Sequence, residues 1–566
     1  MKMKSALLGA ACAFAFAPAA FAERGSDGNV NVIYWQAPSI LNPFLSGGTK
    51  DVEAASLMLE SLARFDEKGN MQPWLATDIP TVANGGVAAD LKSITWKLKP
   101  GILWSDGSPL TANDAVFTWQ YCTDTSGGCA QLSKFDGVEK VEAVDDLTVK
   151  ISFTNPHPYP YLPLVGAESP ILQQAQFKDC LGAAASGCTE QNFNPIGTGP
   201  FKVVEFKTND VLTLEANPNY RDPDKPHFAT MTFKGGGDAE AAGRAVLETG
   251  EFDYAWNLQL SPEVLSGMQA AGKGETMVAF GTLVERIEMN LTDPSPELPE
   301  GERSTAKHPH PILSDMRVRK ALSMAIDRTL LTEIGYGQAG RPTCNLVPAP
   351  EIYASPNTDC IAQDVEGAKA LLDEAGWKVG SDGIREKDGK KLHLLYQTST
   401  NAVRQDFQAL IKQWWEDIGV STELKNVSGS VFFGSDPGSP DTFPRFYADV
   451  EMYANNFPGT DPAAYLGAYT CDKAPRPETQ WQGENINRFC DPEYDKLIDK
   501  LGETGDIAER AKIAIRLNEM LTKDTYTIVP LVDRGTVAAH SNTLGGVILN
   551  SWDTSIWNVA DWYRVK

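Results

Sequence analysis

Hydrophobic residues recur along the chain with two spacings, and each spacing predicts a different element. Two-residue alternation or a short apolar run is typical of strands. It predicts strands at residues 30–35, 94–99, 201–206, 211–216, 420–424 and 528–532, and a strand pair within 138–153. Recurrence every three to four residues predicts helices at residues 52–65, 112–121, 316–335, 365–375, 405–418 and 507–523. Because helices and strands alternate throughout, the sequence predicts an α/β fold.

Turn and loop residues separate these elements. Thr111 stands where a residue would cap the helix that follows it, and Gly376 follows the helix that ends at 375. Residues 429–444 are rich in Gly, Ser, Pro and Asp and predict a loop. Residues 294–311 contain five prolines and several charges, which predicts a surface insertion near a domain boundary.

The N-terminus has the pattern of a cleavable export signal. Lys2 and Lys4 precede an uncharged apolar stretch, and residues 20–22 (Ala-Phe-Ala) give the small-x-small pattern that signal peptidase reads. We therefore expect cleavage after Ala22 and a periplasmic location. Cys12 is disfavoured as a lipidation site because almost no hydrophobic segment precedes it.

Length and charge limit the classes of protein. The chain has 566 residues and a formal net charge of −24, and loss of Lys2 and Lys4 makes it more negative still. An acidic surface argues against nucleic acid or an anionic membrane as the main partner. The length exceeds what one hydrophobic core supports, so we expect two or more domains.

The cysteines agree with export to an oxidising compartment. Apart from Cys12, the eight others lie in four close pairs, Cys122 with Cys129, Cys180 with Cys188, Cys344 with Cys360, and Cys471 with Cys490. The sequence leaves the connectivity open, but each pair brackets a short loop, which favours disulfides between neighbours. The chain contains no C-x-x-C and its six histidines are scattered, so we expect no metal and no cofactor.

Familiar catalytic motifs are absent from the sequence. It contains no G-x-S-x-G and no G-x-x-x-x-G-K-[ST], and glycines 235–237 lack the further glycine of a dinucleotide fingerprint. We therefore expect no enzyme activity. A pair of acids for glycoside hydrolysis is not excluded by counting alone, so a secreted hydrolase stays as an alternative.

Five blocks, in order, resemble the peptide/nickel class of bacterial ABC-importer solute-binding proteins, which is solute-binding protein family 5. The blocks are residues 39–43 with 72–76, 94–119, 197–201 with 217–220, 315–328, and 461–466. The second is the most specific: a strand ending in basic-x-Gly, the turn Asp106-Gly107, and a helix that opens Thr-Ala-x-Asp. The resemblance covers nearly the whole chain after residue 22.

The resemblance implies a two-lobed periplasmic-binding-protein fold of type II with an extra small domain. We map a discontinuous first domain to residues 23–66, 196–290 and 529–566, the extra domain to 67–195, and the second lobe to 291–528. Two crossings, near 290 and 529, would form a hinge that closes on ligand. The expected role is that of a monomeric receptor that passes peptides to the permease of an ABC importer in the inner membrane.

The resemblance also nominates ligand-binding residues, which are Trp35, Ser39, Thr49, Arg286, Tyr453, Asn455, Asn456 and Asp461. An extended peptide would add as a strand between the lobes, with main-chain hydrogen bonds giving affinity. Better-known members carry Trp-x-x-Asp where this chain has Tyr453 and Asn456, and that aspartate holds the ligand amine. A neutral amide cannot offset an ammonium.

Two alternatives follow from this departure. Either another acid, Glu451, Asp449 or Asp461, neutralises the amine, or the solute is not held by a free N-terminus. In the second case it is a nickel chelate, an opine, an oligosaccharide or another amine-bearing compound. Arg286 has two interpretations as well: it pairs with a ligand carboxylate, or it forms a salt bridge with Glu285 or Glu288, which we favour.

Overall fold

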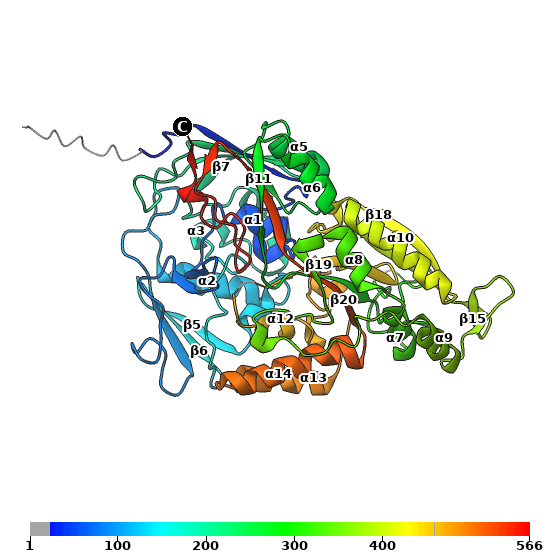
Figure 1. The fold of residues 1–566 in the computed structure, drawn as a ribbon. Helices are drawn as coiled ribbons and strands as arrows, with labels where there is room; N and C mark the ends of the chain where they lie inside the picture. The colour runs from blue at the N-terminus through cyan, green and yellow to red at the C-terminus, as the bar shows by residue number, and fades with distance from the viewer. Residues whose placement is uncertain (1–22, 300, 458, 566) are drawn as a thin grey trace, which may run out of the picture.

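The computed structural model describes residues 23–299, 301–457 and 459–565, and the predicted signal peptide lies outside them. Two large mixed sheets organise the chain (Figure 1). The first contains, in spatial order, β11 (Gly274–Ala279), β21 (Thr536–Ser541), β10 (Tyr254–Trp256), β1 (Asn29–Tyr34), β9 (Thr230–Gly235), β8 (Val211–Ala216) and β7 (Phe201–Lys207). The second contains β13 (Gly340–Pro342), β20 (Ile528–Arg534), β12 (Val284–Met289), β19 (Val450–Asn455), β17 (His393–Ser399) and β18 (Ser421–Val427).

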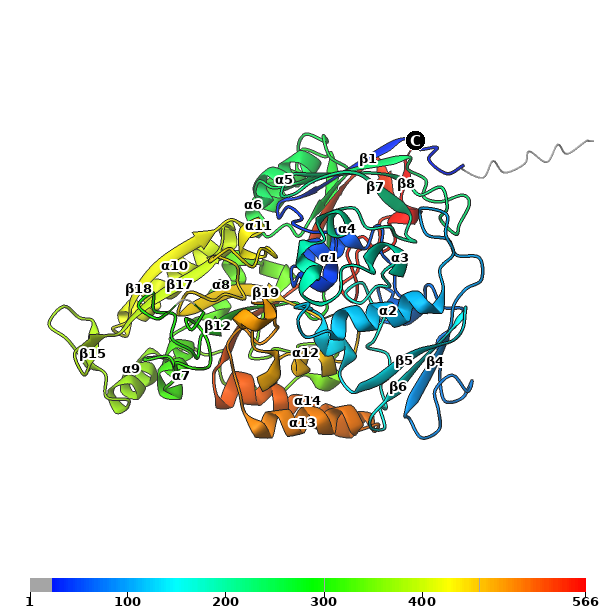
Figure 2. The ribbon, with the colours of Figure 1, turned by 180° about the vertical axis from the view of Figure 1, so that it is seen from behind.

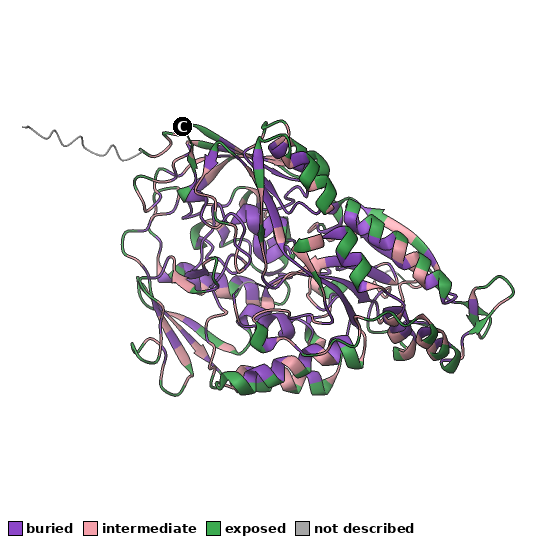
Figure 3. Ribbon diagram, viewed as in Figure 1, coloured by how far each residue is buried: buried purple, intermediate pink, exposed green. Residues whose placement is uncertain are grey.

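The chain passes between the two sheets twice. The first passage joins β11 to β12, and the second joins β20 to β21 through Gly535. Both β12 and β20 are buried along their whole length, as Figure 3 shows for much of the interior. The domain limits near 290 and 529 stay a prediction. Strand β12 lies inside the segment 196–290 that was predicted for the first domain, but it pairs with strands of the second sheet.

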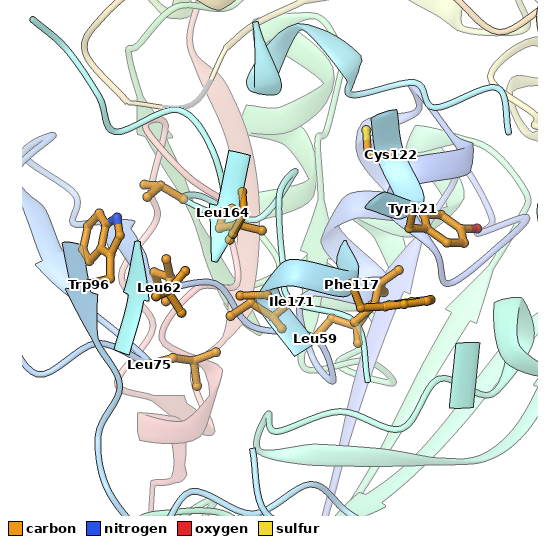
Figure 4. Close-up of a cluster of buried hydrophobic side chains, with 14 of the residues drawn as sticks. Leu59, Leu62, Leu75, Trp96, Phe117, Tyr121, Cys122, Leu164 and Ile171 are labelled. Atoms are coloured by element: carbon orange, nitrogen blue, oxygen red, sulfur yellow. The ribbon is translucent and has the colours of Figure 1, made fainter. Parts of the chain in front are cut away.

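A smaller sheet and one long helix build the region after β2 (Ala63–Phe65) and β3 (Met71–Pro73). Its strands are β4 (Ser93–Lys97), β6 (Thr148–Phe153) and β5 (Val138–Asp145), and α2 (Ala112–Thr123) packs on them (Figure 2). Their core includes Trp96 and Phe117, and it continues into Leu59 and Leu62 from the N-terminal segment (Figure 4). This region therefore shares a hydrophobic core with the segment that precedes it.

The remaining elements surround the large sheets. They are α1 (Thr49–Ala55), α3 (Gln174–Phe177), α4 (Thr189–Phe193), α5 (Ala239–Leu247), α6 (Pro262–Gln269), α7 (Met316–Met324), α8 (Arg328–Gly335), α9 (Val365–Glu374), α10 (Ala402–Asp417), α11 (Gly429–Phe432), α12 (Ala463–Gly467), α13 (Pro492–Glu503), α14 (Ile507–Glu519), β14 (Lys378–Val379), β15 (Arg385–Lys387), β16 (Lys390–Lys391), β22 (Leu544–Gly545) and β23 (Tyr563–Arg564). Among the described residues, no helix combines the length and the apolar character that crossing a bilayer requires.

Most predicted strands and helices are confirmed, with ends displaced by a few residues. The capping prediction at Thr111 is confirmed, because the Asp114 carboxylate accepts from the Thr111 amide at the start of α2. The structure also contains four disulfides, which join the same neighbouring cysteines that the sequence favours.

Two helix predictions are wrong. The helix expected at 52–65 ends at Ala55, because the residues that follow are buried on every side between packed elements, where apolar spacing does not report a helix face. The helix expected at 316–335 is two helices, because Asp327 accepts from the Leu330 amide and caps α8. The predicted loop at 429–444 begins with the short helix α11.

Candidate functional site

A cavity of about 70 Å³ lies where the two large sheets meet, and residues from both sheets line it. A second cavity of about 80 Å³ adjoins it and shares Gly47, Phe443, Tyr453, Asn455 and Asn456 with the first. We call the two together the central cleft. A site between two bodies joined by two chain crossings can open and close by hinge motion.

Helix α1 brings two residues, Thr49 and Glu53, to the cleft. Its first turn is fixed by the buried Asp51 carboxylate, which accepts from the Ser39 amide at 2.7 Å and its hydroxyl at 3.0 Å. Lys50 pairs with the same carboxylate at 2.8 Å. This buried network holds the helix start against the loop that follows β1, and so fixes the direction of Glu53.

Two arginines, Arg404 of α10 and Arg534 at the end of β20, also line the cleft and share one buried carboxylate. Glu285 Oε1 accepts from Arg404 Nε at 2.6 Å, and Glu285 Oε2 lies 3.4 Å from Arg534 Nε. Burial raises the pKa of Glu285, but the two guanidinium groups bring it below its ordinary value. One carboxylate facing two guanidinium groups leaves a surplus of positive charge at this wall.

Two acids, Glu53 and Asp553, line the same cavity as the arginines. Asp553 Oδ1 pairs with Arg64 at 2.5 Å, and Asp553 Oδ2 accepts from the Phe65 amide. Glu53 Oε1 accepts from the Ser555 amide at 2.9 Å, and Oε2 accepts from the Tyr34 hydroxyl at 3.1 Å. Burial raises the pKa of Glu53 even though these hydrogen bonds lower it.

Four of the residues nominated from the sequence line the cleft. Thr49, Tyr453, Asn455 and Asn456 all do so, the last three at or beside the end of β19. β19 pairs with β12 along its length, but its pairing with β17 ends at Met452. Within the described residues, the backbone of Tyr453, Ala454 and Asn455 therefore has no strand partner on that side.

Three other nominated residues serve the packing instead. Trp35 lies in an apolar cluster, and its Nε1 donates to the Asn257 carbonyl at 2.8 Å. The amide and the hydroxyl of Ser39 both donate to the Asp51 carboxylate. Asp461 pairs with Arg510 at 2.5 Å, and both side chains are about 95% buried. None of the three lines either cavity.

Arg286 forms the salt bridge that the sequence favoured, with Glu288 as its partner at 2.5 Å. Its guanidinium also donates to the hydroxyls of Tyr465, Tyr469 and Tyr453. Burial lowers the pKa of Arg286, but Glu288 and the tyrosines hold it above its ordinary value. The side chain is 1% exposed and does not line the cleft, so no ligand carboxylate reaches it in this conformation.

Neither remaining acid proposed to neutralise an amine lines the cleft. Glu451 is fully buried opposite Glu288 in the β12–β19 ladder, and burial raises its pKa well above the ordinary value. Asp449 bonds to His310 Nε2 at 2.8 Å and accepts from the Leu395 amide. Among the described residues, all three acids considered from the sequence are therefore placed elsewhere.

Sequence reasoning missed the charged residues of the cleft, Glu53, Arg404, Arg534 and Asp553. Glu53 had a local signal, because it is the one charged residue within residues 52–59. Arg404 also had one, since it lies in the first turn of the helix that follows β17, where ligand groups of α/β sheets collect. Arg534 and Asp553 lie far along the chain, and no local pattern marks them.

Comparison with known proteins identifies the group to which the chain is similar. Residues 70–474 match the model of "Bacterial extracellular solute-binding proteins, family 5 Middle". Protein XP55 of Streptomyces lividans is 26% identical over 93% of this chain and 89% of its own length. The oligopeptide-binding protein AppA of Bacillus subtilis is 28% identical over 69% of this chain and 68% of its own.

Solved structures show the same fold. AppA in complex with a nonapeptide superposes with a TM-score of 0.80 at 22% identity, covering 96% of this chain and 100% of AppA. NikZ of Campylobacter jejuni, in complex with Ni(L-His), superposes with a TM-score of 0.77 at 21% identity, covering 95% of this chain and 99% of NikZ. The two-lobed fold predicted from the sequence is confirmed.

Proposed function

Because the chain belongs to family 5 of the bacterial extracellular solute-binding proteins, we propose that it is a receptor that captures peptides between its lobes for an ABC importer. The family consists of receptors rather than enzymes. The predicted signal peptide supports a periplasmic receptor, cleaved after Ala22, that diffuses as a monomer and docks on a permease in the inner membrane.

The free edge of β19 is the observation that carries this proposal. The backbone groups of Tyr453 to Asn455 line the central cleft without a strand partner on one side among the described residues. An extended peptide satisfies such an edge through its main chain and is read largely independently of its side chains. Thr49, Asn455 and Asn456 add polar groups around that edge.

The direct test is to identify what the protein carries. The protein would be purified without denaturation from the periplasm, and the solute released from it would be analysed by mass spectrometry. We expect peptides. Titration calorimetry with those peptides and with analogues N-methylated on the backbone follows, and methylation should weaken binding because it removes donors to the β19 edge. Equal affinity for both forms contradicts pairing at this edge.

A non-peptide solute is the second candidate. Asn456, neutral where better-known members carry an acid, favours it, and NikZ shows that this fold accommodates Ni(L-His). Recovery of a nickel chelate, an opine or a sugar, together with no calorimetric response to peptides, would replace the peptide by that solute while keeping the receptor role.

A further inference from the structure

The two acids of the central cleft differ in their counter-charges. Asp553 is neutralised by Arg64 at 2.5 Å. Glu53 is 3% exposed, and no Lys or Arg of the described part of the chain forms an ion pair with it. Its neighbours offer only neutral donors, the Ser555 amide and hydroxyl and the Tyr34 hydroxyl. A buried carboxylate without a cation is costly, and most such groups are paired.

The guanidinium groups of the cleft show the opposite imbalance. Arg404 and Arg534 both line the cavity that Glu53 lines, and Glu285 is the one acid that pairs with either of them among the described residues. Glu285 is fully buried behind them and does not line the cavity. Among the described residues, Glu53 thus has no ion-pair partner, with Arg64 paired to Asp553, and Arg404 and Arg534 share a single carboxylate.

We propose that Glu53 is the residue that neutralises the cationic group of the solute, and that Arg404 and Arg534 receive its carboxylate. This assignment rests on the proposed function, because it names the end groups that the receptor's solute carries. Both ends bind in one small cavity, so the solute is a short zwitterion such as a dipeptide. Asn456 is then explained as well, because helix α1 supplies the acid, Glu53, in place of the segment after β19.

The protonation of Glu53 is consistent with this role. Burial raises the pKa of the carboxyl group, since the hydrogen bonds from Ser555 and Tyr34 and the more distant charge of Arg64 only partly offset the loss of hydration. An ammonium group brought beside it would lower that pKa, because an opposite charge favours the ionised form. Binding would then release a proton wherever Glu53 is protonated in the unliganded receptor.

The test compares three proteins and three probes. The proteins are the wild type, Glu53→Gln and a matched control, Glu451→Gln, which changes another buried glutamate whose pKa burial raises and which lies outside the cleft. The probes are a mixture of dipeptides, the same mixture N-acetylated, and the same mixture with C-terminal amides. Binding is measured by titration calorimetry.

We expect the wild type to bind unmodified dipeptides at least about tenfold more tightly than either modified form, as charge-assisted hydrogen bonds predict. Glu53→Gln should lose at least about tenfold in affinity for unmodified dipeptides and keep its affinity for the acetylated form. Glu451→Gln should match the wild type with all three probes.

A stability measurement makes the result independent of folding defects. Unliganded Glu53→Gln should unfold at the same temperature as the wild type or higher, because the change removes a buried uncompensated charge. The proposal is overturned if Glu53→Gln binds unmodified dipeptides as the wild type does, or if acetylation leaves wild-type affinity unchanged. If the wild type binds no peptide of any form and carries none from the periplasm, the proposed function fails as well.

Discussion

Arg286 shows how a charged residue near a ligand site can serve stability instead. It lies on β12, beneath the ring of Tyr453, with its guanidinium about 5.2 Å from the ring centre. Glu288 neutralises its charge, and three tyrosine hydroxyls accept hydrogen bonds from its Nη1 and Nη2 groups. This cluster supports the end of β19 from behind and so fixes the position of the free edge that faces the cleft.

Replacement of Arg286 by Met should lower the free energy of unfolding by about 3–5 kcal/mol, because Glu288 is left buried without a counter-charge. The measurement is urea denaturation followed by fluorescence. Arg244→Met is the control, since Arg244 lies on the surface of α5 and pairs with the exposed Glu240 and the partly exposed Glu248, where a pair is worth about 0.2–0.5 kcal/mol. Equal losses in the two variants would contradict the role assigned to Arg286.

The break between α7 and α8 shows how one capping residue divides an apolar pattern. Residues 316–335 keep helical spacing throughout, yet α7 ends at Met324 and Asp327 caps a second helix. The new direction lets Arg328 bury its guanidinium, which donates to the carbonyls of Pro530 and Cys360. The element therefore ties β20, next to the second crossing, to a disulfide-bonded loop.

Asp327→Ala should lower the free energy of unfolding by about 1 kcal/mol, because the Leu330 amide loses its acceptor. The control is Glu333→Ala on the exposed face of the same helix, which should leave stability unchanged or slightly improved, since Ala is a good helix former. Denaturation curves of the two variants decide the matter, and a loss of stability in Glu333→Ala as large as in Asp327→Ala would argue against a specific cap.

At the scale of the molecule, polar contacts join the small-sheet region to the second lobe. Lys473 Nζ pairs with Asp136 at 2.8 Å, and Ser133 Oγ donates to Glu484 at 3.1 Å. Lys473 and Glu484 both lie in the loop closed by the disulfide between Cys471 and Cys490. We expect these contacts to separate when the lobes open, so they contribute to the closed form alone.

Glu484 makes this interface sensitive to pH. Burial raises its pKa from the ordinary 4.5 to about 7, although Lys473 and Lys134 lower it. Well below pH 4.5 the carboxyl group is protonated in both the folded and the unfolded chain, so it contributes nothing to the pH dependence of the free energy of unfolding. As the pH rises from about 4.5 to about 7, the unfolded chain loses this proton first, so the free energy of unfolding should fall.

Urea denaturation at several pH values between 5 and 7.5 tests whether the free energy of unfolding falls as the pH rises. Glu484→Gln should show a shallower decline than the wild type, because the neutral amide has no proton to lose. Glu478→Gln, which changes an exposed glutamate in the same loop, should follow the wild type. A wild-type curve that rises over this range with the same slope in Glu484→Gln would contradict the assignment.

The sequence by itself determined the class of fold, most elements and the family. Strand alternation, caps and turns depend on neighbours within a few residues, and the block at 94–119 is local in the same way, so these features can be read from the chain. One failure came where burial is complete: the run after Ala55 is buried on all sides, so its apolar spacing no longer indicates a helix.

Only the tertiary structure decided which polar residues face the cleft. Asp461 looks like a ligand residue in the sequence, but Arg510, 49 residues further along the chain, pairs with it. Glu53 is the reverse case, a buried helix residue that forms no ion pair with any of the described residues. The availability of a charge depends on whether a partner from elsewhere in the chain reaches it, and chain folding alone sets that distance.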